Sequence, residues 1–388
     1  MLGSIIGEIA AFLRVSAIFF INAIKYFLMK GFYNMNYEKY VKVCKRVNNT
    51  KRNYLVLNEA QCKHVPSKPA RALKMFDDLA ELVKDYKNEQ RLLVVGFAET
   101  ATAIGVEVAI QLNCDYVNTT RESFEAEFFN FTESHSHATE QKLIKVDLNY
   151  YNHILFVEDE VTTGNTILNI IRKLSEVNKN IKFSVASILN GMSKENFDKY
   201  EELGIDVHYL VKLDNSGFAD EADRYQLNGD IYDMHNTEAD TKMYFKLANT
   251  RKVTDTAKYN KDLEEICSNL ACKDGVETVL VLGTEECMYP AIKIGAYLES
   301  LGFDVRSHST TRSPIGVVNS SAYPLYTQLC LSSVYNQNRD TYLYNLRNYD
   351  AVYIVSDTGF HNKGMSELIL ALRMFGNKNI TEILLEEK

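Results

Sequence analysis

The most constraining feature of the chain is a strand that runs through an acidic turn into a helix. Residues 153–157 form an apolar run, His-Ile-Leu-Phe-Val, which predicts a buried strand. Apolar residues then recur at helical spacing at Ile167, Ile170, Ile171 and Leu174. A buried strand joined to a helix in this way indicates an α/β fold with a parallel sheet.

The turn between this strand and helix predicts a site for a phosphorylated sugar. It reads Glu158-Asp159-Glu160-Val161-Thr162-Thr163-Gly164-Asn165-Thr166. Backbone N–H groups at a helix start bind phosphate, and the threonine hydroxyls add donors. Glu158 and Asp159 repel a phosphate, so they suit a neutral diol such as the ribose 2- and 3-hydroxyls. The alternative is an ordinary helix N-cap that follows an acidic strand end.

Strands and helices alternate around this unit. Strands are predicted at Tyr54–Leu57, at Leu92–Val95, from Tyr116 and at Phe183–Leu189, with helices over 67–83 and 101–112. Residues 123–148 have poor periodicity. In a parallel sheet covered by helices, ligands bind at the carboxyl ends of the strands, where the turn at 158–166 lies.

A second turn of interest follows the strand at Leu92–Val95. It comprises Gly96, Phe97, Ala98, Glu99 and Thr100, and Gly96 lets the backbone approach an anion closely. Glu99 is unusual beside an anion, and we expect it to bind Mg²⁺ or to cap the helix start. Arg121 suits a two-pronged contact with a phosphate. The alternative is an ordinary strand-to-helix turn.

The turn at 158–166 resembles the phosphoribosyl-diphosphate (PRPP) motif of type I phosphoribosyltransferases. Four apolar residues, two acids, two spacers and a Thr/Gly turn are all present. The resemblance implies transfer of ribose 5-phosphate from PRPP to a nitrogenous, base-like acceptor, with Mg²⁺ as cofactor. It also implies that residues 158–159 and 161–166 form the PRPP site and that Asp159 is a Mg²⁺ ligand. Purine-salvage enzymes often have an acid where Thr162 stands, so an ordinary purine acceptor is not expected.

The resemblance gives further segments a role. It implies that residues 96–100 hold pyrophosphate and that residues 122–148 correspond to a loop that closes over the site. His135 and His137 in that loop are candidates to protonate or steady the leaving pyrophosphate. The pair with its flanking glutamates also has the residue types of a zinc site, and a solvated loop is the third interpretation.

A particular branch of this family matches more of the chain. Orotate phosphoribosyltransferase-like proteins of tellurite-resistance and stress-response gene clusters carry a C-terminal domain named for Thr-Arg-Ser-Pro, which stands here at residues 311–314. Gly283-Thr284-Glu285-Glu286 and residues 342–346 are its other expected motifs, and the resemblance covers about residues 52–388. It implies a phosphoribosyltransferase in a nucleoside-like metabolite pathway, with partner enzymes of such a cluster and a homodimer as further expectations.

The C-terminal third repeats the pattern of the first domain. The strand 278–282 leads to Gly283-Thr284-Glu285-Glu286. Asp304-Val305 then leads to Thr310-Thr311-Arg312, as Asp115-Tyr116 leads to Thr119-Thr120-Arg121. From the helix glycine to the first threonine is fourteen residues in one copy and fifteen in the other. We hypothesise a degenerate, Rossmann-like copy without the paired acids, in which Thr310, Thr311, Arg312 and Ser313 bind an anion and Glu285 and Glu286 bind Mg²⁺ or an amine. The alternative is convergence on common strand-turn-helix chemistry.

These patterns predict four segments. They are an apolar, helical extension at 1–51, a phosphoribosyltransferase-like domain at 52–213, a polar, solvated connector at 214–275 and a C-terminal α/β domain at 276–388. Ten uncharged residues, 15–24, are short for a membrane span. This start is therefore a packed or interfacial helix, a weak anchor, or translation from upstream of a true start at Met29 or Met35; we favour the first or the third.

Composition narrows the function. A chain of 388 residues allows two domains, and a net charge of −8 argues against general nucleic-acid binding. Seven scattered cysteines fit buried thiols in a reducing cytoplasm. Two other functions remain open. A non-catalytic PRPP- or nucleotide-binding regulator would bind PRPP without turnover, although no DNA-binding helix pair is recognisable. A PRPP synthetase-like kinase would consume ATP, although no P-loop is present.

Overall fold

A computed structural model describes residues 37–47, 49, 52–122, 127–132, 140–233, 239–247, 249–270, 275–358 and 363–386. Contacts divide the chain into residues 1–39 and 40–388, and the fold below is that of the second unit. Residues 1–36 of the apolar, helical extension predicted at 1–51 lie outside the described residues, whereas Val41–Lys45 within it form a strand rather than a helix. Within the described ranges, no helix has both the length and the apolar character needed to cross a membrane.

The first domain is built on a mostly parallel sheet with the order β5-β6-β4-β3-β7-β8-β9. Its strands are β3 (Leu92–Gly96), β4 (Asp115–Thr120), β5 (Phe128–Thr132), β6 (Glu140–Ile144), β7 (His153–Val161), β8 (Lys182–Asn190) and β9 (Asp206–Lys212). The antiparallel pair β5–β6 joins the edge of the sheet through β4. A separate hairpin, β1 (Val41–Lys45) and β2 (Tyr54–Asn58), precedes the sheet.

The predicted strands of this domain are present because their side chains are buried on both faces of the sheet. Leu92–Val95 and Ile154–Val157 are almost fully inaccessible to solvent. Continuous apolar runs of this kind are typical of central parallel strands. The fold class predicted from the sequence, a parallel α/β sheet followed by a second α/β domain, is confirmed.

The second domain has its own parallel sheet with the order β11-β18-β17-β13-β14. Its strands are β11 (Thr241–Lys246), β13 (Thr278–Gly283), β14 (Asp304–Ser309), β17 (Ala351–Ser356) and β18 (Ile380–Glu386). A smaller sheet combines β10 (Asp230–Asp233), β15 (Thr327–Ser332) and β16 (Asp340–Tyr344). Buried side chains of both sheets and of the last helix form one apolar core.

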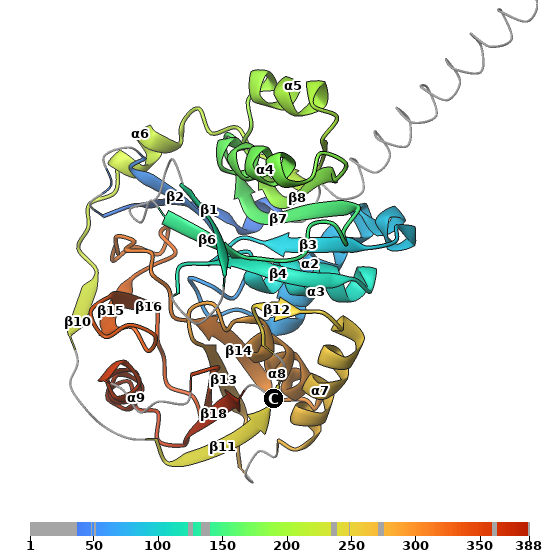
Figure 1. The fold of residues 1–388 in the computed structure, drawn as a ribbon. Coiled ribbons are helices and arrows are strands. Elements are labelled where there is room, and N and C mark those ends of the chain that lie inside the picture. The colour runs from blue at the N-terminus through green and yellow to red at the C-terminus, as the bar shows by residue number, and fades with distance from the viewer. Residues whose placement is uncertain are drawn as a thin grey trace, which may run out of the picture. The chain divides into compact units, whose positions relative to one another are not determined.

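Helices connect the strands and also join the two domains. They are η1 (Glu38–Tyr40), α2 (Pro69–Leu82), η2 (Lys84–Asn88), α3 (Thr102–Leu112), α4 (Asn165–Val177), α5 (Lys194–Glu202), α6 (Phe218–Asp223), α7 (Thr256–Ser268), α8 (Tyr289–Ser300) and α9 (Lys363–Met374). Helix α8 packs on β13 and β14 and also contacts α2 and α3. Figure 1 shows these three helices between the two sheets.

The two domains share one strand order, as the repeat hypothesis requires. The run β4-β3-β7-β8 of the first sheet corresponds to β14-β13-β17-β18 of the second, and all these pairings are parallel. Each domain also inserts an antiparallel hairpin between its second and third shared strand, β5–β6 in one case and β15–β16 in the other. The match therefore extends beyond the strand-turn-helix unit that convergence explains.

The stretch predicted as a polar connector has two different parts. Residues 214–230 are largely exposed. Beyond them, β10 and β11 extend the sheets of the second domain, and β12 (Lys252–Val253) pairs with β4 of the first domain. The second part is therefore built into both domains rather than linking them through solvent.

Candidate functional site

The acidic end of β7 opens into a cavity of about 670 Å³. Glu158 and Asp159 line it and are partly accessible to solvent, directly after the fully buried Val157. Within the described part of the chain, Asp159 makes no hydrogen bond or ion pair. The next residue differs, because Glu160 is bound by Arg52 at 2.6 Å between Nη2 and Oε1. Unlike Glu160, Asp159 thus remains available to a ligand.

The turn after β7 leads into a helix through a glycine in the left-handed conformation. Gly164 has a φ of +75° and directly precedes α4. A Cβ on Gly164 would lie 2.5 Å from the hydroxyl of Tyr200, which itself donates to the Gly164 carbonyl at 2.7 Å. Glycine is therefore required here for both backbone conformation and space. Val161, Thr162, Thr163, Gly164 and Thr166 line the cavity, whereas Asn165 does not.

The loop after β3 reaches the same cavity. Ala98, Glu99 and Thr100 line it, and Gly96 and Phe97 do not. The loop is fixed by hydrogen bonds from Ala98 N to Thr119 Oγ1 at 2.9 Å and from Gln61 Nε2 to the Thr100 carbonyl at 2.8 Å. The peptide bond between Ala98 and Glu99 is cis. Since β3 and β7 are neighbours, the parallel topology brings the two predicted loops to one edge.

Glu99 is held by cations of the protein. One carboxylate oxygen accepts from Lys63 Nζ, and the other accepts from the backbone N–H of Arg312 at 3.1 Å. Burial would raise the pKa of Glu99, but Lys63 and Arg312 outweigh burial and lower it. Lys63 is fully buried and also donates to the carbonyls of Glu285 and Thr310, at 3.0 Å each. With both oxygens engaged, Glu99 does not offer a ligand to Mg²⁺.

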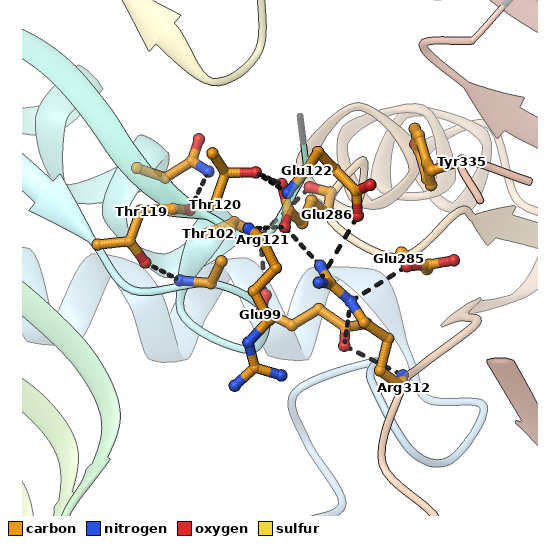
Figure 2. Close-up of polar contacts among 12 residues, drawn as sticks. Glu99, Thr102, Thr119, Thr120, Arg121, Glu122, Glu285, Glu286, Arg312 and Tyr335 are labelled. Atoms are coloured by element: carbon orange, nitrogen blue, oxygen red, sulfur yellow. Dashed lines mark hydrogen bonds and ion pairs between the residues drawn. The ribbon is translucent and has the colours of Figure 1, made fainter. Parts of the chain in front are cut away.

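Arg312 of the second domain lies among four carboxylates of both domains. Its guanidinium is 3.1 Å from Glu285, 3.5 Å from Glu99 and 3.6 Å from Glu122, and it forms an ion pair with Glu286. Figure 2 shows these acids around Arg312, while the guanidinium of Arg121 extends away from them. Arg312 and Ser313 also line the cavity, as does Arg121.

The other predicted site residues of the second domain do not line the cavity. They are Gly283, Thr284, Glu285, Glu286, Thr310 and Thr311. Burial opposes ionisation of Glu286, but Arg312 and Arg251 outweigh it and hold the pKa at about 2. Burial raises the pKa of Glu285 to about 7, against the attraction of Arg312. His135 and His137 lie outside the described residues.

The structure adds site residues that the sequence patterns did not indicate. The hairpin β1–β2 and the segment after it contribute Arg46, Arg52, Leu55, Val56 and His64 to the cavity wall. Burial, with Lys63 nearby, lowers the pKa of His64 to about 3, so its ring is neutral. Lys63 and Arg251 were also missed, because a single lysine or arginine in a polar segment carries no signal of burial. An acid close in sequence would have indicated an ion pair, but the acidic partners, Glu99 of Lys63 and Glu286 of Arg251, are more than thirty residues away.

The donor set around the cavity fits Mg²⁺ only in combination with a ligand. No group of three or more histidine, cysteine or acidic side chains suited to a metal ion occurs in the described ranges. Magnesium commonly binds through one or two carboxylates together with substrate phosphates and water. Asp159, with its unengaged carboxylate, is the residue that suits this arrangement.

Comparison with protein families gives two matches along the chain. Residues 41–215 match the family described as phosphoribosyl transferase. Residues 250–372 match the TRSP domain that lies C-terminal to that transferase domain. Both predicted motif regions therefore fall within the matched ranges.

Single proteins resemble only parts of the chain. A hypoxanthine/guanine phosphoribosyltransferase of Methanothermus fervidus is 32% identical over 75 residues, 19% of this chain and 39% of the relative. The chain thus matches about two fifths of that protein's length. Among solved structures, adenine phosphoribosyltransferase of Rhodothermus marinus is 12% identical with a TM-score of 0.36, over 47% of this chain and 99% of that chain. The enzyme of Trypanosoma brucei is 16% identical with a TM-score of 0.36, over 50% and 83%.

Proposed function

We propose that this chain, which belongs to the phosphoribosyl transferases that carry a C-terminal TRSP domain, transfers ribose 5-phosphate from PRPP to a nitrogen atom of a small, base-like acceptor and releases pyrophosphate. The observation that carries the proposal is that one cavity joins the acidic end of β7, the threonine turn before α4 and the loop after β3. These three elements supply the three kinds of contact that PRPP needs.

Each element has a distinct proposed role. The threonine turn at 161–166 binds the 5-phosphate through backbone N–H groups and hydroxyls at the start of a thirteen-residue helix. Glu158 and Asp159 accept hydrogen bonds from the ribose hydroxyls. The loop at 98–100 and Arg121 bind the pyrophosphate group, whose charge suits backbone amides and a guanidinium.

The proposed reaction exchanges one bond at C1 of the ribose for another. The C1–O bond to pyrophosphate breaks and its electron pair leaves with pyrophosphate, while the acceptor nitrogen bonds to C1 and gives up its proton to the departing pyrophosphate or to solvent. Positive charge develops on the ribose ring, and the carboxylates of Glu158 and Asp159 stabilise it. Bound Mg²⁺, with Asp159 as its proposed protein ligand, would neutralise charge on the departing pyrophosphate.

The acceptor side of the cavity is the wall that the PRPP contacts leave unused. Leu55 and Val56 of β2 and Pro314 of the second domain supply its apolar part. The hairpin and the second domain are joined there by backbone hydrogen bonds from Gly316 N to the Lys45 carbonyl at 2.8 Å and from Val47 N to the Pro314 carbonyl at 3.3 Å. With Thr162 in place of an acid, we propose an acceptor other than an ordinary purine.

The wider setting rests on the resemblance in sequence. A role in a nucleoside-like pathway of stress response and tellurite resistance stays a prediction, as do partner enzymes of such a gene cluster, a homodimer and a cytoplasmic location.

Calorimetric titration of PRPP with Mg²⁺ tests the proposed site. We expect wild type to bind and a Glu158→Ala/Asp159→Ala variant to lose binding. A Glu201→Ala/Glu202→Ala variant on the exposed end of α5 is the matched control and should bind as wild type does. Failure of the folded wild type to bind PRPP would contradict the proposal.

A pyrophosphate-release assay over a panel of nitrogenous bases then tests transfer. Base-dependent release supports a transferase. Tight binding of PRPP without release under any base would favour a regulator. Consumption of ATP with ribose 5-phosphate would favour a PRPP synthetase-like kinase.

A further inference from the structure

The two domains contact each other through corresponding residues. Arg312 N donates to Glu99 of the first domain at 3.1 Å, and Arg121 N donates to Glu286 of the second domain at 3.4 Å. Glu99 and Glu286 each stand three residues after the glycine that ends the first shared strand. Arg121 and Arg312 each follow a Thr-Thr pair, which forms the end of β4 in one domain and comes directly after β14 in the other. This reciprocity is the pattern of an isologous contact between two copies of one subunit.

The internal hydrogen bonds of the two corners repeat as well. Thr119 Oγ1 accepts from Ala98 N at 2.9 Å, and Thr310 Oγ1 accepts from Glu285 N at 3.0 Å. The next threonine of each corner likewise accepts from the backbone N–H two residues later, at 3.0 Å for Glu122 and 3.3 Å for Ser313. The second domain thus keeps the local structure of a pyrophosphate loop and its corner.

The two strand ends differ in what occupies them. Gly96 pairs with Val157 and Gly283 with Val355, so Asp357 has the register position of Asp159. Asp159 faces the cavity, whereas Asp357 accepts from Thr250 Oγ1 at 3.2 Å and Tyr335 Oη at 2.5 Å and forms an ion pair with Arg251. Arg251, whose side chain is 11% exposed, also binds Glu286 at 3.0 Å. The second domain retains one acid of the pair, and protein side chains already fill its binding position.

We infer that the second domain acts as a covalently attached second subunit. Its own sugar-phosphate site is closed by Arg251 and Tyr335. Arg312 is a positioning residue that holds the pyrophosphate loop of the first domain through Glu99. The inference rests on the proposed PRPP site. Arg312 connects the two domains, because its backbone N–H binds Glu99 of the first domain while its guanidinium is anchored by Glu285 and Glu286 of its own domain. If the guanidinium of Arg312 is displaced, its backbone moves, and Glu99 moves with it, together with the neighbouring Ala98 and Thr100 that line the cavity.

The test compares two ligands that differ only in pyrophosphate. Titration of ribose 5-phosphate and of PRPP, both with Mg²⁺, is carried out on full-length wild type and on Arg312→Lys, which keeps the charge but loses the forked contact geometry. We expect the Kd of PRPP to rise at least tenfold and the Kd of ribose 5-phosphate to change less than twofold. Equal affinity for PRPP, or an equal loss for both ligands, would overturn the positioning role.

Two further variants make the result interpretable. Arg373→Lys, in an exposed ion pair with Asp240 of the same domain, is the matched control and should leave both affinities unchanged. Should Arg312→Lys fail to fold, Glu99→Gln replaces it, with the same expected difference between the two ligands. If wild type binds neither ligand, the proposed function fails; if wild type binds and the variants match it, only this inference fails.

The same titrations test the closed second site through their stoichiometry. We expect one PRPP per wild-type chain and no PRPP bound to Glu158→Ala/Asp159→Ala at concentrations that saturate wild type. Two PRPP molecules per wild-type chain, or one remaining in the double variant, would show that the second domain binds PRPP.

Discussion

Asp159 and Glu99 are acids at the same edge of one sheet, yet their surroundings are opposite. Glu99 is buried against Lys63 and the Arg312 N–H, whereas Asp159 faces the cavity with no partner in the described residues. A buried acid with fixed partners contributes to structure, because removing it leaves the partners unpaired. An acid that faces a cavity without partners is available for binding. Glu99 is therefore expected to position the loop, and Asp159 to bind the ligand.

Asp159→Asn and Asp357→Asn should therefore have opposite effects. Asn at 159 keeps the shape but loses the charge near the reacting carbon, so we expect PRPP turnover to fall about 100-fold or more with a melting temperature near that of wild type. Asn at 357 leaves Arg251 without one of its buried partners, so we expect a loss of about 3 kcal/mol in unfolding free energy. Steady-state kinetics and thermal denaturation measure both. Wild-type turnover in Asp159→Asn would refute its proposed role.

Glu286 predicts a component of acid sensitivity. Its pKa is about 2 in the folded chain against an ordinary 4.5, so its charge stabilises the fold above pH 4.5 and this stabilisation is lost as pH falls toward 2. In that window the residue contributes a slope of about 1.4 kcal/mol per pH unit. Denaturant titrations of Glu286→Gln should show a shallower fall in unfolding free energy on acidification than wild type. The exposed Glu202→Gln is the control and should retain the wild-type slope.

At the scale of elements, the turn before α4 depends on Gly164. Alanine there adds a Cβ that meets the Tyr200 hydroxyl at 2.5 Å and also requires the left-handed φ of +75°. Gly204 separates the two effects, because its φ is +66° but no atom lies within 4 Å of an added Cβ. We expect Gly204→Ala to cost about 1 kcal/mol of unfolding free energy, which is the conformational penalty alone.

Gly164→Ala should cost more than that and should also weaken ribose 5-phosphate binding, since the turn that holds the phosphate must shift. Denaturant unfolding and calorimetric titration of both variants measure the difference. Equal losses of stability and unchanged binding in Gly164→Ala would mean that the turn adapts to a side chain.

The elements that the sequence predicted are those whose own residues decide their structure. β3, β13, β17 and the first half of β7 are continuous apolar runs, so their burial follows from composition alone. The hairpin β5–β6 has no such pattern, and strand pairing outside the sequence window decides it: Thr120 pairs with Lys142 across the edge of the sheet. β12 has only two residues and exists because β4 offers an edge. Short edge strands carry little local signal.

The candidate site divides in the same way. The turn at 158–166 and the loop at 96–100 are contiguous and could be predicted as ligand-binding segments. The ion-pair cluster around Arg312 could not, because its acids come from three separate loops of two domains. Arg312 itself was singled out as an anion-binding residue, and in the structure protein carboxylates surround it.

For the whole molecule, the contacts between domains predict a single unfolding event. Lys63 is buried and bonded to Glu99 of the first domain and to two carbonyls of the second, so separating the domains exposes a polar network that neither domain completes alone. We expect one calorimetric transition, with van't Hoff and calorimetric enthalpies equal. Two resolved transitions would show that the domains are energetically independent.

Covalent attachment of the second domain changes how the cavity responds to dilution. Where two separate subunits build one site, lowering their concentration separates them and activity per molecule falls. Here Arg312, Ser313 and Pro314 line the cavity from the same chain. The effective concentration of the second domain at the cavity is therefore fixed by the covalent linkage. The specific activity of this chain should then stay constant as it is diluted, even when only a few copies are present in a cell.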